Sequence, residues 1–412
     1  MMKSFEEKLD QYAELVIKVG LGLKEGQRLL ISSPIETAEF TRKVTKHAYE
    51  NGCKRVMVDW TDTQTSRIHL TLAAEEVLKN DLPSWEIDKY NSLVENHDCF
   101  LMITGNDPNA YKGVPSERMM FVQKNRGEKL QAFSAGQLRG DMHWAIAGAP
   151  TVGWAKSVFP DKNDEEAVDA LWEAIFKTVR VDQNDPVAAW DDHVKTLTEK
   201  VNYLNEQQFK TLHYKSEGTD LSIDLHPDHT WIGGGHHSTF GTYYIPNLPT
   251  EEVFTTPRKY GVNGKVSSSK PLSAMGNIID NFSLTFKDGK VIDFTAEEGY
   301  DTLKQLLSID DGMGYLGEVA LVPHDSPISN SGITFNNTLY DENASCHLAI
   351  GTSITMSVKD AGNLSPEQME EKEINFSRGH TDFMIGSADL EIEAEYEDGR
   401  RISLFKNGNW AI

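Results

Sequence analysis

The first half of the chain alternates short apolar runs with longer stretches of helical periodicity, and this alternation limits the folds open to it. The apolar runs lie at 28–32, 54–60, 99–105 and 143–150. Helical stretches are expected near 5–19, 36–51, 66–79, 84–96, 115–138, 164–180 and 185–210. Short apolar strands joined by helices of about ten to fifteen residues favour a parallel sheet covered on both faces. We therefore predict an N-terminal α/β domain with a mainly parallel sheet over residues 1–195.

From about residue 211 the pattern changes to alternating strands and tight turns. Three segments carry a hairpin signal in their middle: TLHYKSEGTDLSIDL (211–225), SLTFKDGKVIDFTAE (283–297) and ADLEIEAEYEDGRRISLF (388–405). Each turn has an acidic residue followed by glycine, which suits the positive backbone angles of a tight hairpin. The prediction is a β-rich second domain over residues 196–412, so the fold class of the whole chain is α/β plus α+β.

The charge of the chain argues against several classes of partner. Sixty-three acidic residues against forty basic ones give a formal net charge of -23, which repels phosphate backbones and anionic lipids. The first twenty residues form a charged amphipathic pattern, and no apolar run is long enough to span a bilayer. We expect a cytoplasmic protein with no nucleic-acid or membrane partner.

Near the end of the chain the segment GHTDFMIG (379–386) places a histidine and an aspartate two residues apart. In a strand, residues i and i+2 project from the same face, so His380 and Asp382 point together. Imidazole and carboxylate are ligands that suit Zn²⁺, Co²⁺ and related ions. The pattern is open to two interpretations, a metal site or a histidine oriented by its neighbouring aspartate.

Three other segments place isolated acids or a histidine among apolar or small residues. PNLPTEEVFTTP (246–257) holds Glu251 and Glu252, GYLGEVALVP (314–323) holds Glu318, and ENASCHLAIG (342–351) holds His347. A carboxylate is costly to bury unless it is paired or bound to a metal. Weaker candidates are the histidines of turn-rich segments: His226, His229, His236, His237 and His324.

Taken together, these motifs make the chain resemble the thermophilic metallo-aminopeptidase family of the aminopeptidase T and S type. The motifs are PNLPTEEVFT, LGEVALVP, DENASCHLAIG and HTDFMIGS, and the resemblance covers essentially the whole length. It implies two divalent metal ions per chain (zinc, cobalt or manganese), a homodimer, and peptide substrates with a free N-terminus. The ligand pattern carries onto five residues: Glu252, Glu318, His347, His380 and Asp382. The adjacent Glu251 leaves the first assignment open.

The mechanism implied by the resemblance is hydrolysis of the N-terminal peptide bond by a water activated between two metals. Two divalent ions bring +4 and the three carboxylates bring -3, so one hydroxide would make the site neutral. Glu251 is a candidate for anchoring the substrate amine or for moving a proton. It is equally a candidate for a solvent-facing neighbour of the true ligand.

One position departs from the family pattern, which has a tyrosine seven residues after His347. Here that place is Ile354, whose side chain can neither coordinate a metal nor donate a hydrogen bond. Two alternatives to the aminopeptidase hypothesis stay open. One is a two-metal hydrolase of another ester or amide, since paired metal ions serve several hydrolases. The other, favoured by Ile354, is a weakly active, metal-stabilised binding relative.

Overall fold

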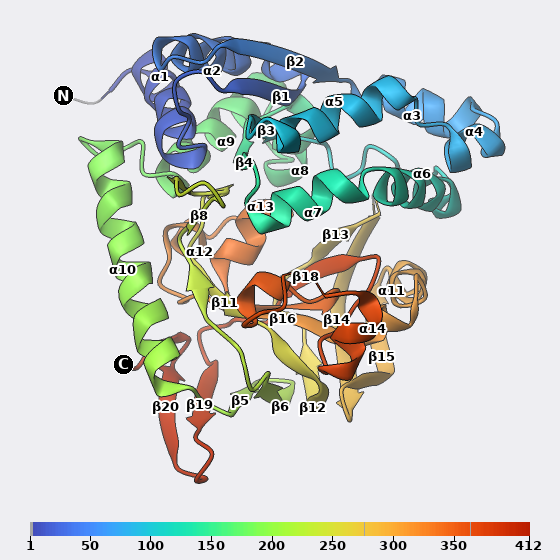
Figure 1. Cartoon of the computed structure of the whole chain (residues 1–412), viewed down its shortest axis with the longest axis vertical. Helices are drawn as coiled ribbons and strands as arrows, with labels where there is room; N and C mark the ends of the chain where they lie inside the picture. Colours follow the sequence, from blue (N-terminus) through green and yellow to red (C-terminus); the bar gives the residue numbers. More distant parts are fainter. Residues whose placement is uncertain (1–2, 276, 363) are drawn as a thin grey trace. The chain divides into compact units, whose positions relative to one another are not determined.

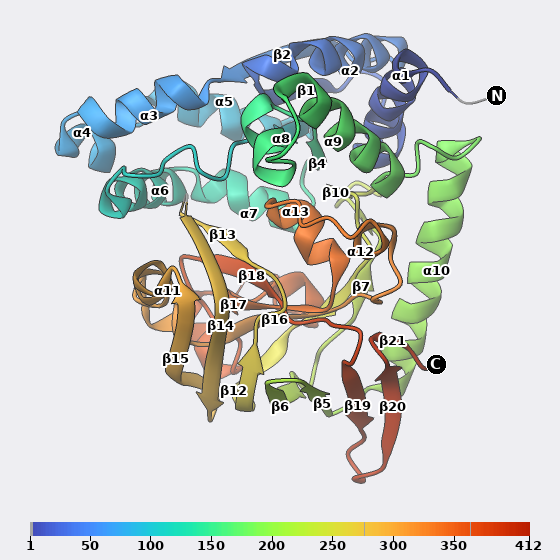
Figure 2. The ribbon, with the colours of Figure 1, turned by 180° about the vertical axis from the view of Figure 1, so that it is seen from behind.

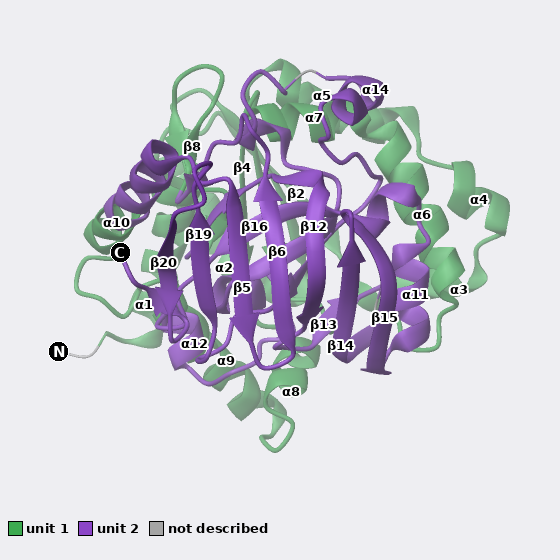
Figure 3. Cartoon of the chain, turned by 90° about the horizontal axis from the view of Figure 1, so that it is seen from below, with its two compact units in different colours: residues 1–194, 235–249 green, residues 195–234, 250–412 purple. Residues whose placement is uncertain are grey.

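The computed structural model describes residues 3–275, 277–362 and 364–412, and the chain divides into two compact units (Figure 3). Residues 1–194 and 235–249 form the first unit, and residues 195–234 and 250–412 form the second. The sequence-based boundary at 195 assigns the segment 235–249 to the second domain, whereas its contacts place it in the first unit. Within the described residues, no helix combines the length and the apolar character needed to cross a membrane.

The first unit is built on a parallel five-stranded sheet in the order β10-β4-β3-β1-β2 (Figure 1). Its strands are β1 (Arg28–Pro34), β2 (Arg55–Thr61), β3 (Cys99–Thr104), β4 (His143–Gly148) and β10 (Asn247–Leu248). Strands β1 to β4 correspond to the four predicted apolar runs. The short strand β10 comes from the returning segment and adds an edge beside β4.

Helices surround this sheet, as Figures 1 and 2 show. They are α1 (Phe5–Leu15), α2 (Ala38–Glu50), α3 (Thr63–Leu72), α4 (Glu75–Asn80), α5 (Ser84–Glu95), α6 (Ser116–Lys129), α7 (Gln131–Arg139), α8 (Val152–Val158) and α9 (Asp164–Thr178). Leu30 of β1 packs with Tyr90 of α5 and Phe133 of α7. Its neighbours Leu29 and Ile31 are also fully buried and face the opposite side of the strand, so both faces of the sheet are covered.

The long helix α10 (Pro186–Gln207) leads into the second unit, which contains two antiparallel sheets. The larger has nine strands (Figure 3): β5 (Thr211–Ser216), β6 (Thr219–Leu225), β12 (Pro257–Ser267), β13 (Leu272–Ala274), β14 (Asn277–Lys287), β15 (Lys290–Glu298), β19 (Glu391–Glu395), β20 (Arg401–Lys406) and β21 (Asn409–Trp410). The smaller has the order β18-β17-β16-β11-β7, with bounds β7 (Ile232–Gly233), β11 (Val253–Thr255), β16 (Leu316–Leu321), β17 (His347–Gly351) and β18 (His380–Met384). Short helices join these strands, namely α11 (Tyr300–Leu307), α12 (Pro327–Asn330), α13 (Thr338–Asp341) and α14 (Pro366–Glu371).

Apolar side chains from both sheets form one core in the second unit. Ile223 of β6 and Val262 of β12 belong to the same buried cluster as Val319 of β16, Leu348 of β17 and Phe383 of β18. Side chains alternate across a strand. The residues directly before and after Val319, Leu348 and Phe383 in their strands therefore face away from that core. The core thus fixes which side chains occupy the other face of the sheet.

The structure confirms the predicted fold class, with a parallel sheet in the first unit and a strand-rich second unit.

Candidate metal centre

The face of the smaller sheet that points away from the core carries four of the predicted site residues. In the strand register, Glu318 of β16 lies opposite Ala349 of β17, which lies opposite Asp382 of β18. The small alanine between them leaves room for the two carboxylates above it. His347 and His380 occupy the neighbouring rows of the same face, at the start of β17 and of β18.

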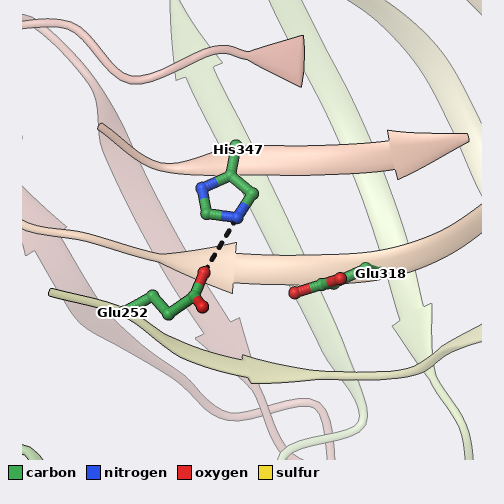
Figure 4. Close-up of side chains that lie close together, drawn as sticks. All are labelled: Glu252, Glu318 and His347. Carbon is green, nitrogen blue, oxygen red and sulfur yellow. Dashed lines mark ion pairs between the residues drawn. The ribbon is translucent and has the colours of Figure 1, made fainter. Parts of the chain in front are cut away.

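The first ligand group consists of Glu252, Glu318 and His347, whose candidate ligand atoms all lie within 4.8 Å of one another (Figure 4). Glu252 directly precedes β11, and its carboxylate lies 3.0 Å from Nε2 of His347. All three residues are buried. Two ligand atoms bound to one ion at about 2.1 Å each are at most about 4.2 Å apart, and the 3.0 Å between Glu252 and His347 lies within that limit.

The second ligand group consists of Glu318, His380 and Asp382, within the same distance limit. Nε2 of His380 lies 3.1 Å from a carboxylate oxygen of Glu318 and 3.3 Å from Oδ1 of Asp382. Glu318 therefore belongs to both groups. A carboxylate with two oxygens is the side chain that can bridge two adjacent cations.

Backbone carbonyls fix the orientation of both imidazoles. Nδ1–H of His347 donates to the carbonyl of Ser345 at 3.2 Å, and Nδ1–H of His380 donates to the carbonyl of Thr352 at 2.8 Å. These bonds leave Nε2 of each ring as the atom that faces the carboxylates, an arrangement typical of metal-binding histidines. Gly317 permits the close approach of β16, since a Cβ there would lie 2.3 Å from the Thr352 carbonyl oxygen.

Burial of the ionisable groups at this centre shifts their pKa values. Burial raises the pKa of Glu318 to about 7, and the carboxylates of Asp382 and Glu252 add to this effect. Burial alone would lower the pKa of His347, but its bond to Glu252 and the nearby carboxylates raise it to about 10. The pKa of His380 is likewise raised, against the effect of burial, by Asp382 and Glu318. Protons thus compensate the negative charge of the buried carboxylates at this centre, and divalent cations bound there would take the place of those protons.

A further buried carboxylate, that of Glu342, was not among the predicted site residues. Burial raises its pKa well above the ordinary value, with contributions from Asp382 and Glu252. It stands next to Asn343, whose amide nitrogen lies 3.4 Å from the Glu342 carboxylate and whose oxygen accepts the N–H of Glu251 at 2.8 Å. The acid pair Asp341-Glu342 at the head of the DENASCHLAIG motif was the signal available in the sequence.

The remaining candidates lie outside the two ligand groups. Glu251 is buried, but its carboxylate belongs to neither group found among the described residues. Ile354 is half-buried, and its carbonyl accepts the hydroxyls of Thr256 and Ser357. The weaker histidine candidates also belong to neither group. His226 and His229, for example, hydrogen-bond to backbone carbonyls.

The chain is similar to known proteins over almost its whole length. The family model of the thermophilic metalloproteases (M29) matches residues 5–410. The aminopeptidase AmpS of Bacillus subtilis is 45% identical over 411 residues, and the aminopeptidase T of Thermus aquaticus is 40% identical; in both cases 100% of each chain is covered. The solved structure of wild-type AmpT from Thermus thermophilus has a TM-score of 0.93 and 37% identity, covering 99% of this chain and 100% of that one.

A strand-rich unit that gathers histidines and carboxylates into two adjoining ligand groups is the framework of a metal-dependent hydrolase. The chain belongs to the M29 family of thermophilic metalloproteases. The resemblance inferred from the four sequence motifs is thereby confirmed.

Proposed function

We propose that this chain is a metallo-aminopeptidase that removes N-terminal amino acids from peptides with the help of two divalent metal ions. The observation that carries the proposal is the pair of ligand groups joined by Glu318. Glu252, Glu318 and His347 would hold one ion, and Glu318, His380 and Asp382 would hold the other. The names of the relatives, aminopeptidases AmpS and T, support the exopeptidase activity.

The residues present fit such ions in donor type and in charge. Imidazole nitrogen with carboxylate oxygen suits zinc, cobalt and manganese. Glu252, Glu318, Asp382 and Glu342 together carry -4 when ionised, the charge that two divalent ions balance. When bound in sites of this kind, paired ions activate a water molecule and polarise the carbonyl of the scissile bond.

The chain's own residues then supply proton transfer and substrate orientation. We assign to the Glu342 carboxylate, buried near the ligands, the transfer of the proton released as water attacks to the leaving amine. Bound cations would keep Glu342 ionised beforehand, against the effect of burial. Glu251, the neighbour of Glu252, is the candidate for pairing with the free ammonium group of the substrate. A carboxylate at that point would restrict cleavage to the N-terminus.

The proposal includes the assembly and the compartment. We infer a homodimer, as the family resemblance implies, and a cytoplasmic location, which is supported by the free thiols of Cys53, Cys99 and Cys346. Sedimentation of the purified protein tests the first, and fractionation of the source cells tests the second.

A second candidate function, that of a weakly active binding relative, is favoured by one observation: Ile354 stands where the family pattern has a tyrosine. The hydroxyls nearest in sequence belong to Thr352, Ser353 and Thr355. Loss of a tyrosine hydroxyl from the site would weaken catalysis and leave metal binding intact.

The test compares three substrates with metal-loaded protein. Leu-p-nitroanilide should be hydrolysed, whereas its N-acetylated analogue and p-nitrophenyl phosphate should not. Equal cleavage of the acetylated analogue would refute an exopeptidase, and cleavage of the phosphate ester would favour the alternative two-metal hydrolase. Binding of two metals without turnover of any substrate would favour the binding relative.

A further inference from the structure

The two ligand groups have the same chemistry and different exposure. Each consists of two carboxylates and one imidazole, with Glu318 in common. In the inner group the side chains of His347, Glu252 and Glu318 are 1%, 9% and 5% exposed. In the outer group the side chains of His380 and Asp382 are 26% and 17% exposed. Because the donor types match, any difference in behaviour between the two positions has to come from their surroundings.

Strand order explains why the surroundings differ. His347 lies on β17, an interior strand, and its register neighbours are Ala320 on one side and Met384 on the other. His380 and Asp382 lie on β18, the edge strand of the sheet. The register partner of His380 is Gly351, which has no side chain to cover the ring.

The backbone carbonyls that orient the two histidines also differ in exposure. The carbonyl that orients His347 belongs to Ser345, which is itself buried, whereas the carbonyl that orients His380 belongs to Thr352, which is half-buried. An ion leaves a protein site when water or a competing ligand replaces its protein ligands one at a time. At the inner group the ligand side chains are screened from water, so this replacement requires a local opening around them, and such openings are rarer in a buried region than at an edge strand.

From this contrast, and resting on the proposed two-metal function, we infer that the two positions exchange their ions at different rates. The inner position, formed by Glu252, Glu318 and His347, retains its ion. The outer position, formed by Glu318, His380 and Asp382, exchanges its ion with free divalent metal. Activity then follows the occupancy of the outer position, so the concentration of free metal regulates the enzyme.

The experiment uses full-length protein loaded with Zn²⁺ and mixed with excess of the chromophoric chelator 4-(2-pyridylazo)resorcinol. We expect release in two phases, with one metal per chain in each and rates that differ about tenfold or more. Activity should disappear with the first phase while one metal is still bound. Adding Zn²⁺ back at that point should restore it.

Variants assign the phases to the positions. Asp382→Asn should remove the fast phase and Glu252→Gln the slow phase, and both substitutions preserve side-chain size. His213→Ala is the matched control, because His213 is also 26% exposed and pairs with a carboxylate, Glu395, at 2.9 Å in the other sheet. Both phases should survive in that variant.

The outcomes separate this inference from the proposed function. Release of both metals in one phase, or loss of the slow phase in Asp382→Asn, would overturn unequal exchange while leaving two-metal catalysis in place. Wild-type protein that binds fewer than two metals at full activity would overturn the proposed function itself. Should either variant fold poorly, isotope exchange of bound zinc in the wild-type protein still distinguishes one rate from two.

Discussion

Two buried histidines begin strands in almost the same local sequence, yet the fold shifts their pKa values in opposite directions. His143 opens β4 in the segment HWAIAG, and His347 opens β17 in the segment HLAIG. Burial lowers the pKa of His143 to about 4, whereas the carboxylate of Glu252 raises the pKa of His347 to about 10 in spite of burial. The difference lies in the partners that the fold supplies.

The first histidine has no carboxylate among the causes of its pKa shift: burial lowers the pKa, and the positive charge of Lys24 lowers it further. Its ring is stacked between those of Phe240 and Tyr244, at 4.8 and 5.0 Å between centroids, and Nε2 lies 3.3 Å from the hydroxyl of Ser238. This environment stabilises the uncharged ring. The second histidine lies among carboxylates, whose burial is costly without a cation. A buried histidine therefore indicates a metal site only where the fold concentrates negative charge around it.

The largest expected effect comes from removing the carboxylate that both ligand groups share. Glu318→Gln should lower kcat/KM for Leu-p-nitroanilide by about a thousandfold, or about 4 kcal/mol of transition-state stabilisation, because both proposed ions lose a ligand. Activity and metal content should be measured together. The exposed Glu393 of β19 is the control, since Glu393→Gln should change neither. A Glu318→Gln variant that keeps full activity and two bound metals would show that Glu318 is not a shared metal ligand, and the contrast between the surroundings of His143 and His347 would then say nothing about metal binding.

The next largest effect is a loss of folding stability at acid pH, which we expect from His143. The pKa of His143 is about 4 in the folded protein against an ordinary 6.5, so the unfolded chain binds the proton more tightly. Its stabilising contribution is full above pH 6.5 and falls as the pH drops toward 4, by about 2.5 kcal/mol at pH 4.5.

Denaturant unfolding at pH 7 and pH 4.5 checks this value. His143→Phe keeps an aromatic ring in the stack and should lose less stability on acidification than the wild-type protein by about that amount. Substituting the exposed His69 by Gln should leave the acid sensitivity unchanged. Equal acid sensitivity of His143→Phe and wild type would show that His143 is not the titrating group.

A smaller effect is expected from the residue that holds the Glu251-Glu252 segment. Asn343 is fully buried, accepts the N–H of Glu251 and donates to the carbonyl of Leu339. Asn343→Ala should lower kcat about tenfold, in the range found for groups that orient metal ligands. Asn343→Leu keeps the volume but lacks both hydrogen bonds, and it should be impaired to a similar degree. Full activity of Asn343→Leu would show that the side chain serves packing alone.

The smallest effect is expected at Ile354. Ile354→Tyr should leave activity unchanged or raise it by up to about tenfold, because a hydroxyl returns to a position where one hydrogen bond to a transition state is worth about 1 kcal/mol. Steady-state kinetics measure the change, and Ile354→Phe separates the hydroxyl from the ring. A large loss in Ile354→Tyr would show that the apolar side chain belongs to a repacked site.

Most of the fold could be predicted because the decisive signals are local. The strands β1 to β4 are apolar on both faces and stand out between amphipathic helices, and the three acid-glycine turns mark hairpins. The return of residues 235–249 to the first unit could not be predicted. Its strands β8 (His236–His237), β9 (Tyr243–Tyr244) and β10 have two residues each, too few to show periodicity.

The candidate site was predictable where one strand supplies two groups. The spacing of His380 and Asp382 places them on one face, and the structure sets Nε2 and Oδ1 3.3 Å apart. Glu342 was missed because DENAS reads as an exposed polar turn, and its burial depends on strands distant in the sequence. The contrast between HWAIAG and HLAIG shows the same limit, since local sequence does not reveal which partners the fold brings to a histidine.

The most direct test of the account is a metal count on purified full-length protein, with activity measured before and after chelation. We expect two divalent ions per chain, loss of activity on chelation, and recovery when zinc, cobalt or manganese is returned. Full activity with no bound metal, or with a single ion per chain, would contradict the assignment of the two ligand groups joined by Glu318.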